Sequence, residues 1–489
     1  MASQTTLQKK LAELQEPKQT HQNSRPKIQK VAEYLRNREH FEKQYSPKFV
    51  SIGPIHHDSP NLKLGENYKL TWAAKYIQTT QQDPEFLHKK IADNIFELKS
   101  RFADDVLALA NIAESLKDFR GLEEKLAWLL FADGCSLLYI LINVKLYQLD
   151  KPKDRITNLG QIDGVNINVD DDPEHLNMKV DQLVLVMMDV LLLENQLPYK
   201  VLKLLWKNEN DKELIDTMKN FLKNYHWATQ DKKTTWSRPG IFSNTGQIKK
   251  TKAEDDLPND IIETPTHLLD LQRKMILLTK SNSKTEANKE ANYEMKQSGK
   301  YSEEMMTYRN IQDLTAVGIK LKSSRTRSPT DVDFSEDWFA AKLTLPEIVV
   351  DDNTAASFLN LIAYEMCPDF KNDYGICSFA VFMDSLIDHP EDVKKLRSKG
   401  ILVNSLGSDE EVANLFNIIS TDLVLNPETY LKVKAKIHEH YRNKCNIWIT
   451  EGCNTYFSNP WAITGFIAAV IALVLTFVQT WFSIFPSHN

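Results

Sequence analysis

Apolar residues recur every three or four positions in several stretches of the chain, a spacing that puts them on one face of an α-helix. The clearest stripe is formed by Ile91, Ile95, Leu98, Phe102, Val106, Leu109, Ile112 and Leu116. Leu122 to Leu149 is apolar nearly all round, so we expect a helix in the centre of the core there. Further helices are predicted over 28–41, 183–193 and 266–278, and again from residue 354 onward.

Local signals mark where some of these helices begin and end. Pro198 suits the first turn of a helix, because its ring already sets a helical φ. Gly400 stands where a helix would end in a left-handed residue. Ser408 and Glu411 have the spacing of a capping box, in which each side chain bonds the backbone of the other residue.

Only one region has the alternation of a strand. Residues 317–322 alternate apolar and polar positions with period two, and residues 341–350 are rich in Leu, Thr, Ile and Val. A polar loop over 323–337 joins the two stretches, so we expect a small antiparallel β ribbon. The predicted fold class is mainly α, with this ribbon and one C-terminal transmembrane helix.

The last apolar stretch, Trp461 to Phe485, runs for 25 residues without Asp, Glu, Lys or Arg. A helix of that length rises far enough to cross a hydrocarbon layer of about 30 Å. Trp461 and Trp481 stand near its two ends, where indole rings prefer the lipid headgroups. We predict a transmembrane helix over 461–485; a buried core helix is the alternative interpretation.

The flanks of this stretch predict its orientation. Five basic residues lie between positions 430 and 444, and such flanks stay in the cytosol. The N-terminal segment has no apolar region of a secretory signal, and only four residues follow the span. We therefore expect a tail-anchored, single-pass protein of the plasma membrane or endomembranes with its main domain in the cytosol. Gly465 and Ala469 are spaced so that two such helices could approach closely and form a homodimer.

Composition refines the domain organisation. Residues 1–27 are predicted to be a flexible tail and 28–455 a helical domain, with polar insertions near 228–262 and 279–304. Only 15 glycines among 489 residues favour helices over turn-rich folds. A net charge of −6 does not resemble the basic footprint of a nucleic-acid binder, so no nucleic-acid partner is expected. The five cysteines are odd in number and include no C-x-x-C pair, so they do not indicate a disulfide framework.

The chain offers few candidates for chemistry. His56, His57 and Asp58 could supply metal ligands, but neighbouring residues on an extended segment diverge. His438 and His440 lie about 200° apart on a predicted helix, so we interpret them as solvated residues near the membrane. Cys135 has no nearby basic residue in sequence that would favour its thiolate, and is expected to be buried. We predict no metal and no cofactor.

Asp189 and Glu194 are the two most informative carboxylates, because they flank an apolar helix. Buried side by side they could do acid–base work, but five residues apart they point about 140° away from each other. We expect Asp189 to be hydrogen-bonded inside the core and Glu194 to be tied to the helix end. No catalytic residue is assigned.

Eight stretches of the sequence, in this order, resemble one family: SPKFVSIGPIHH, ADGCSLLYIL, MMDVLLLENQLPYKVL, IQDLTAVGIKLK, LPEIVVDDNTAASFLNLIAYE, FMDSLIDHPEDVKKLRSKGIL, GSDEEVANLF and YFSNPW. The chain is similar in them to the plant domain-of-unknown-function family number 247, also called uncharacterised protein family 0481, over about Ile28 to Phe485. Ala32, Ser136 and Met366 depart from the usual residues of that family, as packing changes.

The resemblance implies a mostly helical, single-pass membrane protein of plants without an established enzyme activity. Some grass relatives are associated with self-incompatibility recognition. We therefore expect a membrane-anchored interaction or recognition component that binds a protein partner, and not an enzyme. The alternatives are a hydrolase-like enzyme with a noncontiguous site, using Asp189, Glu194 or His56, and a purely structural membrane protein.

Overall fold

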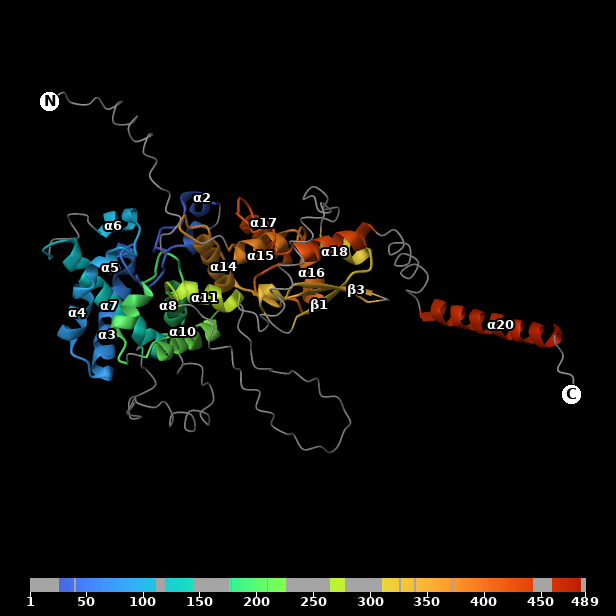
Figure 1. Ribbon diagram of the computed structural model, residues 1–489, viewed down its shortest axis with the longest axis horizontal. Coiled ribbons are helices and arrows are strands. Elements are labelled where there is room, and N and C mark those ends of the chain that lie inside the picture. The colour runs from blue at the N-terminus through green and yellow to red at the C-terminus, as the bar shows by residue number, and fades with distance from the viewer. Residues whose placement is uncertain are drawn as a thin grey trace, which may run out of the picture. The chain divides into compact units, whose positions relative to one another are not determined.

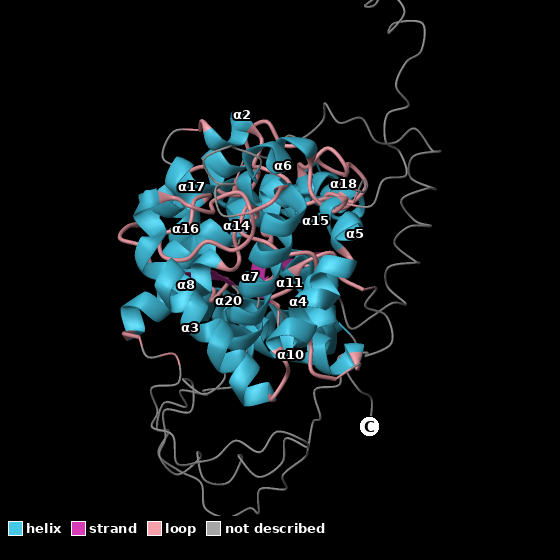
Figure 2. Cartoon of the chain, turned by 90° about the vertical axis from the view of Figure 1, so that its left-hand side faces the viewer, coloured by secondary structure: helices cyan, strands magenta, loops and turns pink. Residues whose placement is uncertain are grey.

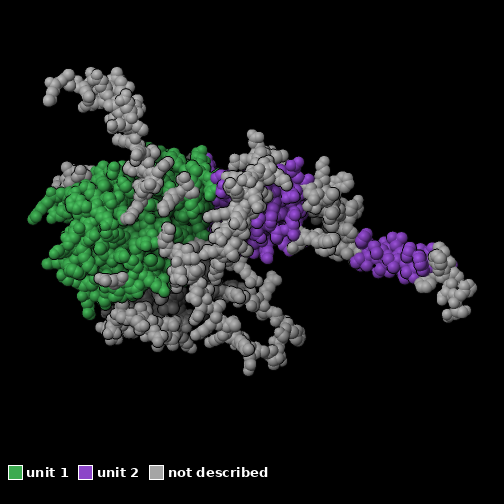
Figure 3. All heavy atoms as spheres, in the orientation of Figure 1, with its two compact units in different colours: residues 1–280, 349–377, 422–426 green, residues 281–348, 378–421, 427–489 purple. Residues whose placement is uncertain are grey.

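Helices make up most of the structure, a computed structural model that confirms the predicted mainly helical class (Figures 1 and 2). The chain divides into two compact units, which Figure 3 colours separately. The residues that the structure describes are 26–38, 41–110, 119–143, 176, 178–208, 210–225, 264–277, 310–324, 327–337, 340–370, 373–442 and 460–484. The predicted insertions at 228–262 and 279–304, and nearly all of the predicted tail, lie outside them.

Unit 1 comprises Met1–Lys280, Val349–Cys377 and Asp422–Asn426. Its helices are α2 (Glu33–Arg36), α3 (Lys63–Thr80), α4 (Pro84–Asp93), α5 (Ile95–Lys99), α6 (Asp104–Ala110), α7 (Leu122–Asn143), α8 (Val180–Asp189), α9 (Tyr199–Leu205), α10 (Asp211–Tyr225), α11 (Leu268–Leu277), α14 (Asp352–Glu365) and the start of α15 (Gly375–Asp384). Two short 3-10 turns, Glu42–Gln44 and Pro60–Leu62, connect them. The helix predicted over 266–278 is confirmed by α11.

The centre of unit 1 is α7, as the apolar run from Leu122 predicts. It contacts α3, α4, α5, α9 and α10, and Figure 2 shows it surrounded by other helices. Cys135, Leu138 and Ile140 are wholly inaccessible to solvent. Gly134 lets α9 approach, because a Cβ there would lie 2.5 Å from Leu205 Cδ1. The predicted extension of this helix to Leu149 lies outside the described residues.

The apolar stripe from residue 91 is buried, but three helices carry it. Ile91 lies in α4, Ile95 and Leu98 in α5, and Val106 in α6, and all are buried. Asn94 separates α4 from α5 with a φ of −102° and a ψ of 7°. The period of the stripe therefore gave its buried face, while the breaks between the helices depend on residues outside the stripe.

The helix predicted over 28–41 is wrong for most of its length. Among residues 28–38 and 41, which the structure describes, only α2, four residues long, is helical. Ile28 instead forms an isolated parallel bridge with Phe102. The Ile28 N–H donates to the Arg101 carbonyl at 2.8 Å, and the Ala103 N–H donates to the Ile28 carbonyl at 3.0 Å. These long-range backbone bonds replace the helical ones.

The helix predicted over 183–193 ends earlier, at Asp189. Residues 190–197 continue as buried turns, because their backbone and side chains bond to other parts of the unit. Pro198 then forms the N-cap of α9, one residue before the position that the sequence predicted.

Unit 2 comprises Ser281–Ile348, Ser378–Thr421 and Pro427–Asn489. Its elements are α13 (Ile311–Ala316), β1 (Lys320–Ser323), a 3-10 turn (Pro329–Asp331), β2 (Asp333–Asp337), β3 (Ala340–Leu345), the start of β4 (Ile348–Val350), α16 (Pro390–Ser398), β5 (Leu402–Asn404), α17 (Asp409–Ile419), α18 (Leu431–Arg442) and α20 (Pro460–Ile484). Two predicted helix signals are confirmed here. Gly400 has a φ of +65°, and Ser408 forms the capping box with Glu411.

The predicted ribbon needs a correction. The strands form a three-stranded sheet in the order β1-β3-β2, and β1 runs parallel to β3, not antiparallel. The antiparallel partner of β3 is β2, which lies in the segment 323–337 that we predicted to be a polar loop. Its one buried aromatic residue, Phe334, pairs with Leu343. Because the chain passes through β2 before it enters β3, β1 and β3 point the same way.

A long apolar helix stands at the predicted place near the C-terminus. Among the described residues, two helices are long and apolar enough to cross a membrane: α7, whose apolar window is 83% buried, and α20, whose window Thr464–Trp481 is 0% buried. The apolar helix predicted over 461–485 is therefore confirmed as a helix with exposed side chains. Its crossing of a membrane stays a prediction.

Candidate functional site

Residues 47–57 form a segment of unit 1 that is neither helix nor strand and is buried over residues 49–54; we call it the clasped segment. Val50, Ser51 and Ile52 have no exposed surface. Buried backbone N–H groups need acceptors, and here side chains supply them. The Asp189 carboxylate accepts three, from Lys48 at 2.9 Å, Phe49 at 2.6 Å and Val50 at 2.8 Å.

Asn195 holds the next part of the clasped segment. Its Oδ1 accepts the Ile52 N–H at 2.6 Å, and its Nδ2 donates to the Val50 carbonyl at 3.0 Å. The same Nδ2 also donates to the Asp189 carbonyl at 2.9 Å. A carboxamide both accepts and donates hydrogen bonds, so Asn195 holds the clasped segment against the end of α8.

Asp133, on α7, accepts a hydrogen bond from the next backbone N–H of the clasped segment, that of Gly53. Its Oδ2 lies 2.7 Å from the Gly53 nitrogen, and its Oδ1 lies 2.7 Å from Lys69 Nζ. Gly53 is needed for its backbone, since its φ is +81° and a Cβ would stand 3.0 Å from the Gln196 carbonyl oxygen. The carboxylate of an apolar helix thus receives both a charge partner and a backbone donor.

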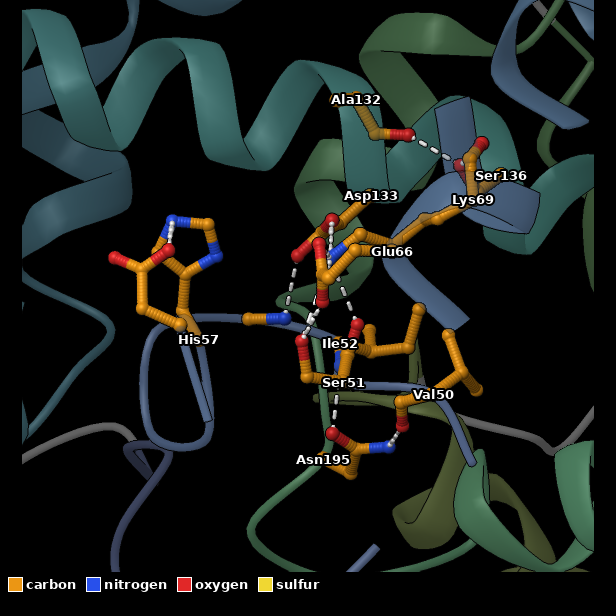
Figure 4. Close-up of polar contacts among 12 residues, drawn as sticks. Val50, Ser51, Ile52, His57, Glu66, Lys69, Ala132, Asp133, Ser136 and Asn195 are labelled. Atoms are coloured by element: carbon orange, nitrogen blue, oxygen red, sulfur yellow. Dashed lines mark hydrogen bonds and ion pairs between the residues drawn. The ribbon is translucent and has the colours of Figure 1, made fainter. Parts of the chain in front are cut away.

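Lys69, on α3, lies beside Asp133, on the side of the clasped segment that faces away from Asn195 (Figure 4). It is 2% exposed, and its Nζ donates to the Ser51 carbonyl at 2.9 Å and reaches Glu66 at 2.8 Å. Burial acts to lower the pKa of Lys69, but the charges of Asp133 and Glu66 outweigh burial and raise that pKa. Figure 4 shows Ser51 and Ile52 between this ion cluster and Asn195.

The electrostatics of this cluster do not favour nucleophilic chemistry. The Ser51 hydroxyl donates to Glu66, and Lys69 is held charged between two carboxylates. A lysine that activates a serine must be neutral to take up a proton. What the arrangement can do is bind the protein's own backbone in an extended form.

Glu194 forms a second cluster in unit 1. Its Oε1 accepts the Val31 N–H at 2.8 Å and lies 2.5 Å from Arg36 Nη2, while its Oε2 lies 2.9 Å from His56 Nε2. Burial acts to raise the pKa of Glu194, but the bonds from His56 and Arg36 outweigh burial and lower it. The carboxylate is therefore ionised and ties α2 to the end of the clasped segment.

The structure brings only some of the candidate residues together. His56 meets Glu194, whereas Asp189 bonds to the backbone of residues 48–50, so the two carboxylates do not share a site. The predicted hydrogen bonding of Asp189 inside the core is confirmed. The expected tie of Glu194 to its own helix end is wrong, because its partners lie on two distant segments.

The structure also shows the surroundings of three further candidate residues. Cys135 is buried as expected, and burial raises the pKa of its thiol to about 12, so it is not a thiolate near neutral pH. His57 lies beside Asp58, with Nε2 to Oδ1 at 3.4 Å. His440 corrects an expectation: it is 8% exposed and not solvated. Across the described residues, no group of three or more His, Cys, Asp or Glu is arranged to hold a metal ion.

Sequence reasoning missed Asp133, Asn195, Lys69 and Glu66. Three stretches that carry the family resemblance meet at this site: SPKFVSIGPIHH supplies the clasped segment, ADGCSLLYIL supplies Asp133, and MMDVLLLENQLPYKVL supplies the Asp189–Gln196 turn. A polar residue inside an otherwise apolar run was the available signal, in each of the last two stretches. It predicted buried polar residues but not their common target.

A helical core around one apolar helix, with a further segment held by buried carboxylates, makes this a mostly helical protein. The chain belongs to the family DUF247, described as "Plant protein of unknown function", whose model matches residues 28–475.

Two proteins of Arabidopsis thaliana are among its relatives. UPF0481 protein At3g47200 is 25% identical over 467 residues, covering 91% of this chain and 84% of that protein. Putative UPF0481 protein At3g02645 is 29% identical over 185 residues, covering 38% of this chain and 34% of that protein. No solved structure matches the chain.

Proposed function

We propose that the protein is a single-pass membrane component that binds a protein partner through its helical units, with α20 as the anchor. The observation that carries the proposal is α20 itself: a helix of 25 residues whose apolar window Thr464–Trp481 is 0% buried, including Leu473 at 70% and Phe477 at 68% exposure. Exposed apolar surface of this extent is costly in water and favourable in lipid. The helix satisfies its own backbone groups, which lipid requires.

The setting of the buried carboxylates supports a binding function over an enzymatic one. Asp133, Asp189 and Glu194 are the groups best placed for acid–base work, yet each holds backbone N–H groups of the same chain. A catalytic carboxylate must be able to reach a substrate. These carboxylates therefore support a rigid helical body, and a rigid body is suited to present a surface to a partner.

Removal of the anchor tests the first half of the proposal. Deleting Trp461–Asn489 should move the protein from carbonate-washed membranes to the soluble fraction. A matched control replaces the same residues with an unrelated transmembrane helix of equal length and should keep the protein in the membrane. Sedimentation of the deleted form with washed membranes would show that another part of the chain binds lipid.

Orientation is tested by glycosylation. The basic residues before α20 favour a cytosolic position for the helical units. A sequon on a short linker after Asn489 should then be glycosylated in the endoplasmic reticulum, and one inserted near Ser281 should stay unmodified. The reverse pattern would place the helical units, and the partner, on the other side of the membrane.

The partner itself is approached by proximity labelling in plant cells. The full-length protein is compared with a control in which the same tag is carried by residues 460–489 alone. Proteins labelled only by the full-length form are candidates for the cytosolic partner. Identical labelling by both forms would favour the alternative of a purely structural membrane component.

One contact keeps an enzymatic alternative under consideration. The Glu194 carboxylate orients His56 through a bond of 2.9 Å, and an imidazole oriented in this way can act as a general base. If the protein hydrolyses a substrate, His56→Gln should abolish turnover while the fold is retained. Partner labelling that is unchanged in His56→Gln would instead support the binding function.

A further inference from the structure

α18 is the last helix that the structure describes before α20, and in unit 2 it packs on strand β2. Two of its side chains make specific contacts with the strand. Lys436 Nζ donates to the Phe334 carbonyl at 3.3 Å. His440, four residues later and one turn along the helix, lies against the Phe334 ring at 6.0 Å between centroids.

Both ring nitrogens of His440 face oxygen atoms. Nδ1 lies 2.6 Å from Glu336 Oε1, and Nε2 lies 3.3 Å from the Val317 carbonyl oxygen. A carbonyl oxygen and an ionised carboxylate can accept hydrogen bonds but cannot donate them. The Glu336 side chain is 54% exposed. Both nitrogens must therefore donate if both bonds are to exist.

A neutral imidazole carries one N–H, while the imidazolium carries two. In the neutral form, one nitrogen would turn a lone pair toward an oxygen lone pair, and one of the two bonds would be lost. The ring is 8% exposed, so water has little access to replace the lost bond. Only the imidazolium form of His440 can therefore keep both hydrogen bonds.

We propose that His440 is a charge-dependent latch: as the imidazolium it fastens α18 to β2 and to the end of α13, and its loss of a proton loosens α18. The direction of the pH dependence follows from the hydrogen-bond partners of the ring. A group that bonds better when charged stabilises the contact at low pH, and this stabilisation is lost as the pH rises. The latch does not depend on whether α20 crosses a membrane.

Other charged residues lie on the same three elements, β2, α13 and α18. β2 also carries Asp333, and α13 carries Asp313, which are both acidic residues. On α18 itself stand Lys436, Glu439 and Arg442, of which Lys436 is engaged with the Phe334 carbonyl. The direct partner of the ring is Glu336, so the latch needs that carboxylate.

Hydrogen exchange of the full-length protein in detergent tests the latch. After correction for the intrinsic pH dependence of exchange, protection of α18 should fall about tenfold between pH 5.5 and 8, because about 1.4 kcal/mol of hydrogen bonding is lost. Peptides from α17 report on the rest of unit 2 and should show no such change. Equal behaviour of α17 and α18 would overturn the proposal.

Matched variants separate the latch from general stability. Glu336→Gln removes the carboxylate at a half-exposed position, so it should fold and should lower the protection of α18 at pH 5.5 to its level at pH 8. Glu439→Gln makes the same chemical change at an exposed position of α18 and should leave the pH dependence intact. The proposal fails if the two variants behave alike.

The charge itself can be observed directly. With histidine labelled by nitrogen-15, the two ring nitrogens of an imidazolium give nearly equal shifts, while those of a neutral ring differ widely. The signal of His440 is identified by its loss in His440→Gln. At pH 5.5 we expect the pattern of the imidazolium; a neutral ring there would overturn the proposal, whatever the exchange data show.

Discussion

α7 and α20 are both long and apolar, yet they differ in the partners of their polar side chains. In α7, Asp133 bonds to Gly53 and Lys69 on other elements, and the Ser136 hydroxyl lies 2.7 Å from both the Lys69 carbonyl and the Ala132 carbonyl of its own helix. In α20, the Thr476 hydroxyl donates to the Ala472 carbonyl of its own helix at 2.8 Å. Thr480 does the same one turn later, toward the Thr476 carbonyl.

This difference separates a core helix from a helix suited to lipid better than apolar content does. A helix whose polar groups need partners on other elements is only stable inside a folded unit. A helix that satisfies every polar group internally can lie in a solvent that offers no hydrogen bonds. Burial agrees, with 83% of the apolar window buried in α7 and 0% in α20.

The sharpest way to break this comparison is the same charged substitution in both helices. Leu138→Asp puts an unpaired carboxylate at a position of α7 with 0% exposure, and should cost several kcal/mol of a total of about 5–15. Thermal unfolding of the full chain in detergent should lose its cooperative transition. Leu473→Asp in α20, at 70% exposure, should keep that transition and reduce membrane retention instead. The opposite pattern would exchange the roles of the two helices.

Acid should act on the helical units and spare the anchor. Burial lowers the pKa of His267 to about 4, so this histidine is neutral in the folded state and must be protonated as the chain unfolds. Its contribution to the free energy of unfolding is complete above about pH 6.5 and is lost as the pH falls toward 4, by up to about 3 kcal/mol. α20 has no titratable side chain, so membrane retention should not change over this range.

A control variant is needed because Asp189 acts with the opposite sign. Burial raises the pKa of that carboxyl to about 6, so its contribution to stability falls as the pH rises through the same range. The difference in unfolding free energy between the native protein and His267→Gln isolates the histidine. This difference should shrink as the pH falls from 6.5 to 4. A difference that does not change with pH would show that His267 is not neutral in the fold.

The third test compares two glycines. A Cβ on Gly134 of α7 would meet Leu205 Cδ1 at 2.5 Å and Val201 Cγ1 at 3.0 Å, whereas a Cβ on Gly465 of α20 meets nothing within 4 Å. Gly134→Val should lower the free energy of unfolding by about 2 kcal/mol through overpacking. Gly465→Val should leave it unchanged in denaturant titrations. If Gly465→Val also alters the oligomeric state in detergent, the predicted homodimer through the span gains support.

The smallest expected effect comes from the two hydroxyls. Ser136→Ala removes a buried hydroxyl that lies 2.7 Å from the Lys69 carbonyl of α3 and from the Ala132 carbonyl of α7, and should cost about 1 kcal/mol. Thr476→Val removes a bond that lies within α20 and should change neither stability nor membrane retention. Denaturant midpoints and carbonate extraction measure the two effects. Equal losses would mean that α20 also depends on packing within a folded unit.

Local sequence signals predicted the fold well wherever a single stretch determines its own structure. The capping box at Ser408 and Glu411, the left-handed Gly400 and the burial of α7 are confirmed. Each depends on neighbours a few residues away or on the apolar content of one helix. The position of the second long apolar helix was predicted for the same reason.

Long-range partners explain the errors. Residue 28 bonds to the backbone of residues 101–103, so the helix predicted from it does not form. α8 ends at Asp189, whose carboxylate serves the clasped segment about 140 residues away. The residues next to position 28 or next to Asp189 in the sequence do not indicate these distant partners. The candidate site was missed for this reason: of the buried polar residues that build it, only Asp189 was predicted to be hydrogen-bonded inside the core.

The clasped segment also dictates an order of events during synthesis. Its N–H groups wait for acceptors made later in the chain: Gly53 for Asp133, 80 residues on, and Ile52 for Asn195, 143 residues on. At the usual speed of about 5–20 residues per second, the ribosome reaches Asn195 roughly 7–30 seconds after Ile52 has been made. Throughout that interval the Ile52 N–H lacks the acceptor that it has in the folded protein, although Tyr68, which contacts Phe49, has already been made.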